Sequence, residues 1–333
     1  MTTRIWTAAM LCAATIATPA AAQTRSISQN DRAQGAQANP QLLAQYGGKY
    51  SGPQSAYVER VGKRVAVQSG LSNASGDFTV TLLNSPVENA FAIPGGYVYI
   101  TRQLLALMNS EAELASVMGH EVGHVAARHA AGRQTRSTIG QLLAAGAGAL
   151  TGSDLAGRIV GTGAQFYTLK YGRDQEYQAD ALGVRYLSGA NYDPYAAADM
   201  LAALDASTTL SASVANRTGA RVPTWMSTHP NGADRVRRAR QLAAATGRQP
   251  APEVQDTTFL RMLDGLRYDG GTGANALPAK TLRIVTVRAG DTVASLAQRM
   301  AYTTNQRERF VVLNGLDPSN PTVTPGMLVK VIV

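Results

Sequence analysis

The sequence is poor in cysteine, aromatic residues and long apolar runs. Cys12 is the single cysteine among 333 residues. It lies in a leader that we expect to be removed, so disulfides and cysteine catalysis are excluded for the mature chain. Aromatic residues make up only 6%, and no dense basic run carries interleaved aromatics, which argues against a nucleic-acid partner. The formal charge of +9 instead fits attraction to anionic surfaces such as lipid headgroups.

The first 22 residues predict a secretory signal peptide. Arg4 supplies the positive charge, and residues 5–17 are mostly apolar but too short to span a bilayer. Residues 20–22 read Ala-Ala-Ala, a suitable cleavage site. We therefore expect a periplasmic protein with no transmembrane helix in its mature chain, an amino-terminal membrane anchor being the alternative.

The patterns along the chain predict an α+β fold in two folded parts. Residues 23–43 predict a flexible lead-in, and they are followed by a main domain over 44–248, a linker with a short helix over 249–282 and a small unit over 283–333. Alternating β-branched residues predict strands over 78–83 and 97–101. Helices are predicted over 54–69, 110–132, 173–187, 194–206 and 233–245.

A Gly/Ala-rich apolar stretch covers residues 137–168. Asp154 and Arg158 interrupt it before it reaches the length of a membrane span. We expect a mobile lid that touches substrate or membrane, and a buried helical hairpin is the alternative.

Residues 120–124 read His-Glu-Val-Gly-His, the pattern H-E-x-x-H, inside a predicted helix. Side chains four residues apart lie on one helix face, so His120 and His124 point the same way. Two neutral imidazoles suit Zn²⁺. Glu121 is placed to take a proton from water at the metal, which is the chemistry of a general base.

A catalytic zinc site needs a third protein ligand, and Glu176 and Asp180 offer it. These two carboxylates are also four residues apart on a later helix. One of them is expected to bind the metal, while the other accepts a hydrogen bond from the free ring nitrogen of His120. A solvated acidic helix face is the alternative.

Two further histidines complete the total of four. On a continued helix His129 lies about 140° away from His124, off the ligand face, which favours a structural role. His229 precedes Pro230 on a predicted turn. It is either an ordinary turn histidine or a residue that approaches the metal, as a replaceable fourth ligand or a stabiliser of the oxyanion.

Four motifs in order resemble those of the zinc metallopeptidase family that includes the CAAX prenyl protease, HtpX and BepA. They are residues 89–96, 119–125, 176–180 and 228–230. The resemblance covers residues 44–242 and implies a gluzincin fold, mainly helical with a small mixed sheet.

The resemblance also implies roles for single residues. It places one zinc ion on His120, His124 and Glu176. Glu121 becomes the general base, and His229 matches a histidine that occupies the open zinc position and keeps such enzymes latent. Arg235 matches a family arginine near the site, a surface arginine being the alternative. Because the family's transmembrane helices are absent, the periplasmic branch is favoured, with misfolded envelope proteins as substrates and outer-membrane assembly machinery as a candidate partner.

A second prediction concerns substrate binding by the segment Asn89, Ala90, Phe91 and Ala92. An extended stretch before Pro94 and two glycines suits a sheet edge beside the metal. A substrate peptide could add to this edge as a further strand. An ordinary loop is the alternative.

Residues 283–333 resemble a LysM peptidoglycan-binding module with a βααβ order. The matching parts are the turns at Gly290-Asp291-Thr292 and Asn314-Gly315-Leu316. Peptidoglycan is therefore a candidate partner, and a small packing domain is the alternative.

These patterns together predict a secreted zinc endopeptidase. Two other functions stay open at this point. One is a chaperone-like binder of outer-membrane proteins with latent protease activity, and the other is a peptidase that cuts peptidoglycan cross-links.

Overall fold

The computed structural model describes residues 27–72, 75–129, 171–218, 225–227, 229–230, 232–252, 254–269 and 279–333. The expected signal peptide and the stretch 137–168 lie outside these described residues. No helix in the described ranges is long and apolar enough to cross a membrane.

A three-stranded mixed sheet forms one layer of the larger unit. Its strands are β1 (Thr79–Leu83), β2 (Ala90–Ile93) and β3 (Tyr97–Thr101), in the order β1-β3-β2. The central strand β3 pairs parallel with β1 and antiparallel with β2. The two predicted strands are therefore present, and β2 lies at an edge of this sheet.

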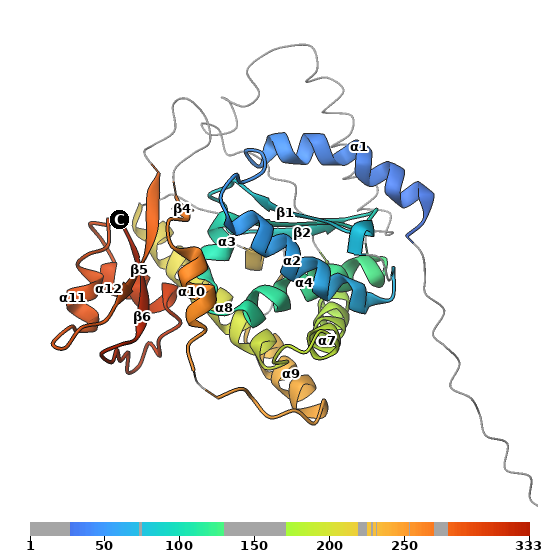
Figure 1. Ribbon diagram of the computed structural model, residues 1–333. Helices are drawn as coiled ribbons and strands as arrows, with labels where there is room; N and C mark the ends of the chain where they lie inside the picture. Colours follow the sequence, from blue (N-terminus) through green and yellow to red (C-terminus); the bar gives the residue numbers. More distant parts are fainter. Residues whose placement is uncertain are drawn as a thin grey trace, which may run out of the picture.

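The two faces of the sheet carry different apolar clusters, because alternate residues of a strand point to opposite sides. Ala90 and Ala92 join the main core, whereas Phe91 and Ile93 belong to a second cluster with helix α1 (Gln29–Gln45). Figure 1 shows α1 on one side of the sheet. Helices α2 (Gln54–Ala66) and α4 (Glu111–Ala126) lie on the other.

Helix α1 differs from the flexible lead-in that composition predicted for residues 23–43. Ser28 caps the helix, since its hydroxyl accepts the backbone N–H of Asp31 at 3.0 Å. Ala38 and Leu42 are buried against the sheet. A polar segment of this kind gains its helical stability from tertiary packing, which composition alone does not report.

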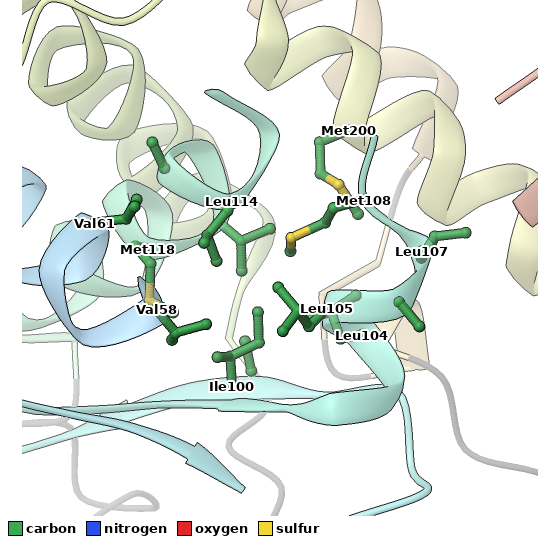
Figure 2. Close-up of a cluster of buried hydrophobic side chains, with 14 of the residues drawn as sticks. Val58, Val61, Ile100, Leu104, Leu105, Leu107, Met108, Leu114, Met118 and Met200 are labelled. Atoms are coloured by element: carbon green, nitrogen blue, oxygen red, sulfur yellow. The ribbon is translucent and has the colours of Figure 1, made fainter. Parts of the chain in front are cut away.

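The main core lies between the sheet and the helices (Figure 2). Val58 and Val61 come from α2, Ile100 from β3, and Leu114 and Met118 from α4. The remaining walls are α3 (Arg102–Leu107), which the sequence reading missed, and α8 (Ala196–Thr218). Helices α2 and α4 bury their apolar faces here, so α4 is fixed along its length.

Helix α4 lies against α7 (Arg173–Gly189) with glycines at the contact. A Cβ atom added at Gly183 would lie 3.1 Å from the backbone nitrogen of His120, and one at Gly123 would lie 3.0 Å from the carbonyl oxygen of Ala179. These spaces are tighter than ordinary van der Waals contact. The two backbones therefore approach as closely as helices can.

The helix ends differ from the expected bounds. The helix expected to reach residue 132 ends at Ala126, and Arg128 adopts a left-handed φ of 57°. Helix α8 runs on to Thr218, beyond the expected end at 206. Helix α9 (Gly232–Ala245) and the 3₁₀ turn η4 (Trp225–Ser227) complete the larger unit.

The carboxy-terminal unit has the βααβ order that the sequence predicts. After α10 (Thr257–Leu263) and β4 (Arg267–Tyr268) come β5 (Lys280–Thr286), α11 (Val293–Ala297), α12 (Gln306–Leu313) and β6 (Leu328–Ile332). The strands stand in the order β4-β5-β6. Its apolar residues belong to the same cluster as the main core, so the unit packs directly on the rest of the molecule.

The side chain of Lys330, on β6, contacts the connection between α3 and α4. Its ammonium group is fully buried and donates to the carbonyl oxygens of Ala106, Leu107 and Met108 at 2.9, 3.0 and 2.8 Å. These are carbonyls at the end of α3, where a cation is favoured. Burial lowers the pKa of Lys330 to about 7, and the nearby carboxylate of Glu113, on α4, opposes this shift. The small unit is thus fixed to the connection between α3 and α4.

Candidate metal centre

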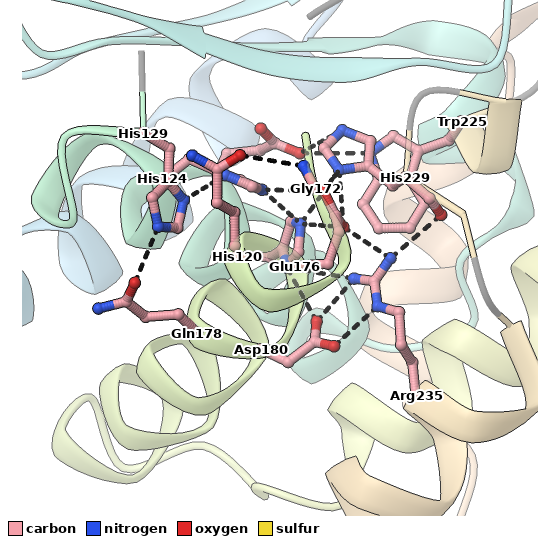
Figure 3. Close-up of polar contacts among 12 residues, drawn as sticks. His120, His124, His129, Gly172, Glu176, Gln178, Asp180, Trp225, His229 and Arg235 are labelled. Atoms are coloured by element: carbon pink, nitrogen blue, oxygen red, sulfur yellow. Dashed lines mark hydrogen bonds and ion pairs between the residues drawn. The ribbon is translucent and has the colours of Figure 1, made fainter. Parts of the chain in front are cut away.

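Three elements bring the predicted ligands to one point (Figure 3). Helix α4 presents His120 and His124 one turn apart, α7 presents Glu176, and His229 follows η4. All four side chains are buried, at most 5% exposed. Their ligand atoms lie within 4.8 Å of one another.

The spacing of these atoms fits a tetrahedral ion. A site with bonds of about 2.0–2.1 Å has donor–donor edges of about 3.3 Å. His120 Nε2 lies 3.0 Å from His124 Nε2 and 3.3 Å from His229 Nδ1. Glu176 Oε1 lies 3.6 Å from His124 Nε2 and 3.0 Å from His229 Nδ1. Nitrogen and carboxylate donors at these separations match the preferences of Zn²⁺.

Asp180 settles which nitrogen of His120 faces the other ligands. Its Oδ1 lies 2.9 Å from His120 Nδ1, so that nitrogen donates and Nε2 is the ring nitrogen that faces the other ligands. Spacing alone left open which of the two carboxylates belongs with the ligands, and the family resemblance assigned Glu176. In the structure Glu176 lies in the ligand cluster and Asp180 contacts His120.

Arg235 is fully buried beside both carboxylates. Its guanidinium donates two hydrogen bonds of 2.7 Å to Asp180 and lies 2.8 Å from Glu176 Oε2. It also donates to the carbonyl oxygen of His229 at 3.1 Å. A surface position is therefore excluded, and the side chain holds the two acids and the His229 backbone in place.

The charges of the cluster shift the pKa values of its members. Although burial opposes ionisation, His229 and His120 hold the pKa of Glu176 far below its usual range. Burial and the neighbouring imidazoles hold the pKa of His124 well below its usual value. Although burial opposes it, hydrogen bonds to Asp180 and Glu176 raise the pKa of His120 to about 9. Glu176 and His124 therefore already have the forms that bind a metal ion, whereas His120 releases a proton when the metal binds.

Glu121 lies beside the ligand cluster with one oxygen held. Its Oε1 accepts the indole N–H of Trp225 at 3.2 Å and lies 3.7 Å from His229 Nε2. Trp225 also stacks on the His229 ring, with centroids 4.2 Å apart and planes at 12°. The sequence reading missed Trp225, because a lone tryptophan in a turn carries no pattern that links it to a metal motif.

His129 lies off the ligand face, as predicted, yet it touches a ligand. Its Nδ1 is 2.8 Å from Nδ1 of His124, and its Nε2 is 3.0 Å from Oε1 of Gln178. The ring of Tyr171 stacks on that of His124, with centroids 3.8 Å apart. Both contacts restrain the ring of His124.

The predicted substrate segment is an edge strand, but its side chains serve packing. Phe91 stacks on Tyr99 and lies tilted against Tyr46, with ring centroids 4.8 and 5.0 Å away. Asn89 donates to the hydroxyl of Tyr46 at 3.0 Å. Any contact of β2 with a substrate would therefore use its backbone.

Comparisons with known proteins find a peptidase family and relatives named as proteases. A family model described as Peptidase family M48 matches residues 53–243, a range that includes all four candidate ligands. The mitochondrial metalloendopeptidase OMA1 of Schizosaccharomyces pombe is 31% identical over 188 residues, which are 56% of this chain and 52% of that protein.

Two bacterial relatives match a similar share of the chain. The beta-barrel assembly-enhancing protease of Escherichia coli (strain K12) is 30% identical over 198 residues, 56% of this chain and 38% of that protein. The protein of the same name from Yersinia pestis is 28% identical over 217 residues, 62% of this chain and 42% of that protein. The chain thus spans about half the length of these curated relatives or less.

Proposed function

The chain belongs to peptidase family M48, and on this basis we propose that it is a zinc-dependent endopeptidase that cuts misfolded or stalled proteins of the bacterial envelope. The observation that carries the proposal is the buried group of His120, His124, Glu176 and His229, whose donor atoms have the separations of a tetrahedral zinc site.

Zinc, when bound, supplies a Lewis acid that polarises the scissile carbonyl and lowers the pKa of water. The residues of the chain transfer the protons and hold the ligands in position. Glu121 accepts the proton of the attacking water and passes it to the leaving amine, for which its position directly after His120 is suited. The burial of the cluster excludes bulk water and strengthens these electrostatic interactions. Asp180 and Arg235 hold His120 and Glu176 in position throughout.

His229 gives the site a closed state. Its Nδ1 lies within 3.3 Å of both Glu176 and His120, where a fourth ligand would lie. In that position it occupies the place that water or substrate needs. When substrate displaces the ring, the imidazole remains close enough to stabilise the oxyanion, so one residue serves latency and catalysis in turn.

The proposal extends to the substrates, the compartment and a glycan-binding module. The name of the beta-barrel assembly-enhancing protease refers to the assembly of β-barrels, and envelope proteins of that kind are the substrates we propose. The Ala-rich leader of the sequence supports export to the periplasm. The βααβ order of residues 280–332 supports a LysM-like module that binds peptidoglycan.

The test is the variant Glu121→Gln in the purified mature chain. We expect it to bind one zinc ion per chain as the parent does and to lose casein cleavage by at least about 100-fold, since a general base contributes about 10²–10⁴ in rate. Metal analysis and a casein digest measure the two effects. The control is Glu59→Gln, which changes an exposed acid paired with Lys63.

Cleavage by Glu121→Gln at a rate close to that of the control would overturn the role of Glu121. A parent chain that binds zinc and holds unfolded outer-membrane proteins but never cuts them would favour the chaperone-like binder. That reading draws support from His229, which closes the ligand set. Clearing of a cell-wall suspension would instead favour the peptidoglycan peptidase.

A further inference from the structure

A chain of hydrogen bonds runs outward from His124, away from the other ligands. His124 Nδ1 lies 2.8 Å from His129 Nδ1, and His129 Nε2 lies 3.0 Å from Gln178 Oε1 (Figure 3). His129 is buried, at 6% exposed, and Gln178 closes the chain from the surface of α7. The contacts therefore link the ligand His124 on α4 to the neighbouring helix α7 through His129.

The backbone explains how a residue off the ligand face reaches the ligand. On a continued helix, the position five residues after His124 would lie about 140° round the axis. Helix α4 instead ends at Ala126, and the left-handed φ of Arg128 turns the chain back. This turn places His129 beside His124, on the side opposite to the metal-facing nitrogen.

The directions of these bonds follow from the chemistry of the groups. Gln178 Oε1 only accepts, so His129 Nε2 carries a hydrogen. A neutral His129 then has a bare Nδ1, which accepts the hydrogen of His124 Nδ1. His124 Nε2 is left with its lone pair, and this is the atom that faces His120 Nε2 at 3.0 Å. The reverse direction would put a hydrogen on Nε2 and exclude the metal.

We propose that His129 is a positioning residue of the metal centre, which fixes the tautomer and orientation of His124 while Gln178 orients His129 in turn. Each ligand histidine of α4 then has its own partner, a carboxylate for His120 and an imidazole for His124. Loss of such a partner typically lowers metal affinity by about 10–100-fold. The proposal rests on the zinc site of the proposed function and is independent of proteolysis.

The test measures zinc affinity by competition with a chromogenic chelator. We expect His129→Leu to weaken zinc binding by about 10–100-fold. His129→Asn places an amide oxygen where Nδ1 lies, so it should restore affinity to within about threefold of the parent. The visible spectrum of the cobalt-substituted protein should change in the Leu variant and stay close to the parent's in the Asn variant.

Gln178→Ala provides a second test that leaves the buried histidine in place. We expect it to weaken zinc binding several-fold, whereas Arg185→Ala, an exposed change on the same helix, leaves binding unchanged. The proposal is overturned if the Leu variant binds zinc within about twofold of the parent, or if the Asn variant loses as much as the Leu variant. Unchanged zinc affinity in Gln178→Ala would show that Gln178 does not orient His129. Loss of proteolysis alone changes none of these readouts.

Discussion

At the scale of single residues, His229 has the clearest regulatory consequence. Its ring is held between Trp225, on which it stacks, and Glu176, which lies 3.0 Å from its Nδ1. We predict that His229→Ala raises basal casein cleavage several-fold, because the fourth ligand position becomes open. Cleavage rates at equal zinc content measure the effect. A loss of cleavage with zinc retained would show instead that oxyanion stabilisation is the dominant role of the residue.

Glu88 is a second residue with a measurable effect, on stability. One oxygen accepts from Ser207 at 2.7 Å, while Oε1 is shielded from solvent and has no hydrogen-bond partner within the described ranges. Burial raises the pKa of Glu88 to about 7, against the opposing hydrogen bonds from Ser207 and the Trp225 backbone. The folded state therefore holds this proton more tightly than the unfolded state.

The stability from this proton is complete below about pH 4.5 and is lost as the pH rises to about 7. We predict that Glu88→Gln removes this decline and stabilises the protein at pH 8 by up to about 3 kcal/mol, an upper bound because the residue is only partly buried. Urea denaturation across pH 4–8 measures it. The same decline in Glu88→Gln as in the exposed control Glu59→Gln would contradict the assignment.

The sequence was informative about residues whose spacing is itself a chemical requirement. His120 and His124, and Glu176 and Asp180, each repeat the four-residue period of a helix face, and all four lie in the centre. Trp225 and His129 could not be found this way. The first acts from a turn and the second through a left-handed residue after a helix end, and neither leaves a periodic pattern.

At the scale of elements, the sequence predicts where helices and strands exist better than where they stop. The expected helix around the H-E-x-x-H pattern is present, and Ser110 caps it by accepting the backbone N–H of Glu113 at 3.1 Å. Its end at Ala126 depends on the path of the following residues. Helix α1 was missed because its apolar contacts, Ala38 and Leu42, are too few to form a pattern without the sheet beneath them.

The contact of α4 with α7 sets the geometry of the centre. Gly119 faces Gly183 so closely that a Cβ at Gly119 would lie 3.3 Å from the Gly183 backbone. Ligands from two separate helices therefore meet because the backbones meet. A larger side chain at either glycine would separate Glu176 from the imidazoles before it changed any ligand itself.

At the scale of the whole molecule, Lys330 joins the carboxy-terminal unit to the connection between α3 and α4. We predict that Lys330→Met lowers the free energy of unfolding by about 3 kcal/mol, because three carbonyls lose their donor and Glu113 loses its counter-charge. Urea denaturation of the full chain measures this.

The control is Lys280→Met, whose ammonium forms a partly exposed pair with Asp269 at 3.5 Å and should change stability by less than about 1 kcal/mol. Equal losses of stability in the two variants would show that the buried contacts of Lys330 contribute no more than a partly exposed ion pair. From the sequence we expected a small unit separate from the main domain. The sequence pattern around Lys330 does not distinguish a buried lysine that binds backbone carbonyls from an exposed lysine in a strand.

The contacts of Lys330 also fix an order of events during synthesis. Its partner Met108 precedes it by 222 positions. A chain that grows from its amino terminus thus completes helix α4 long before Lys330 is added. The nascent chain therefore carries all four candidate metal ligands before the contacts that hold the small unit can form.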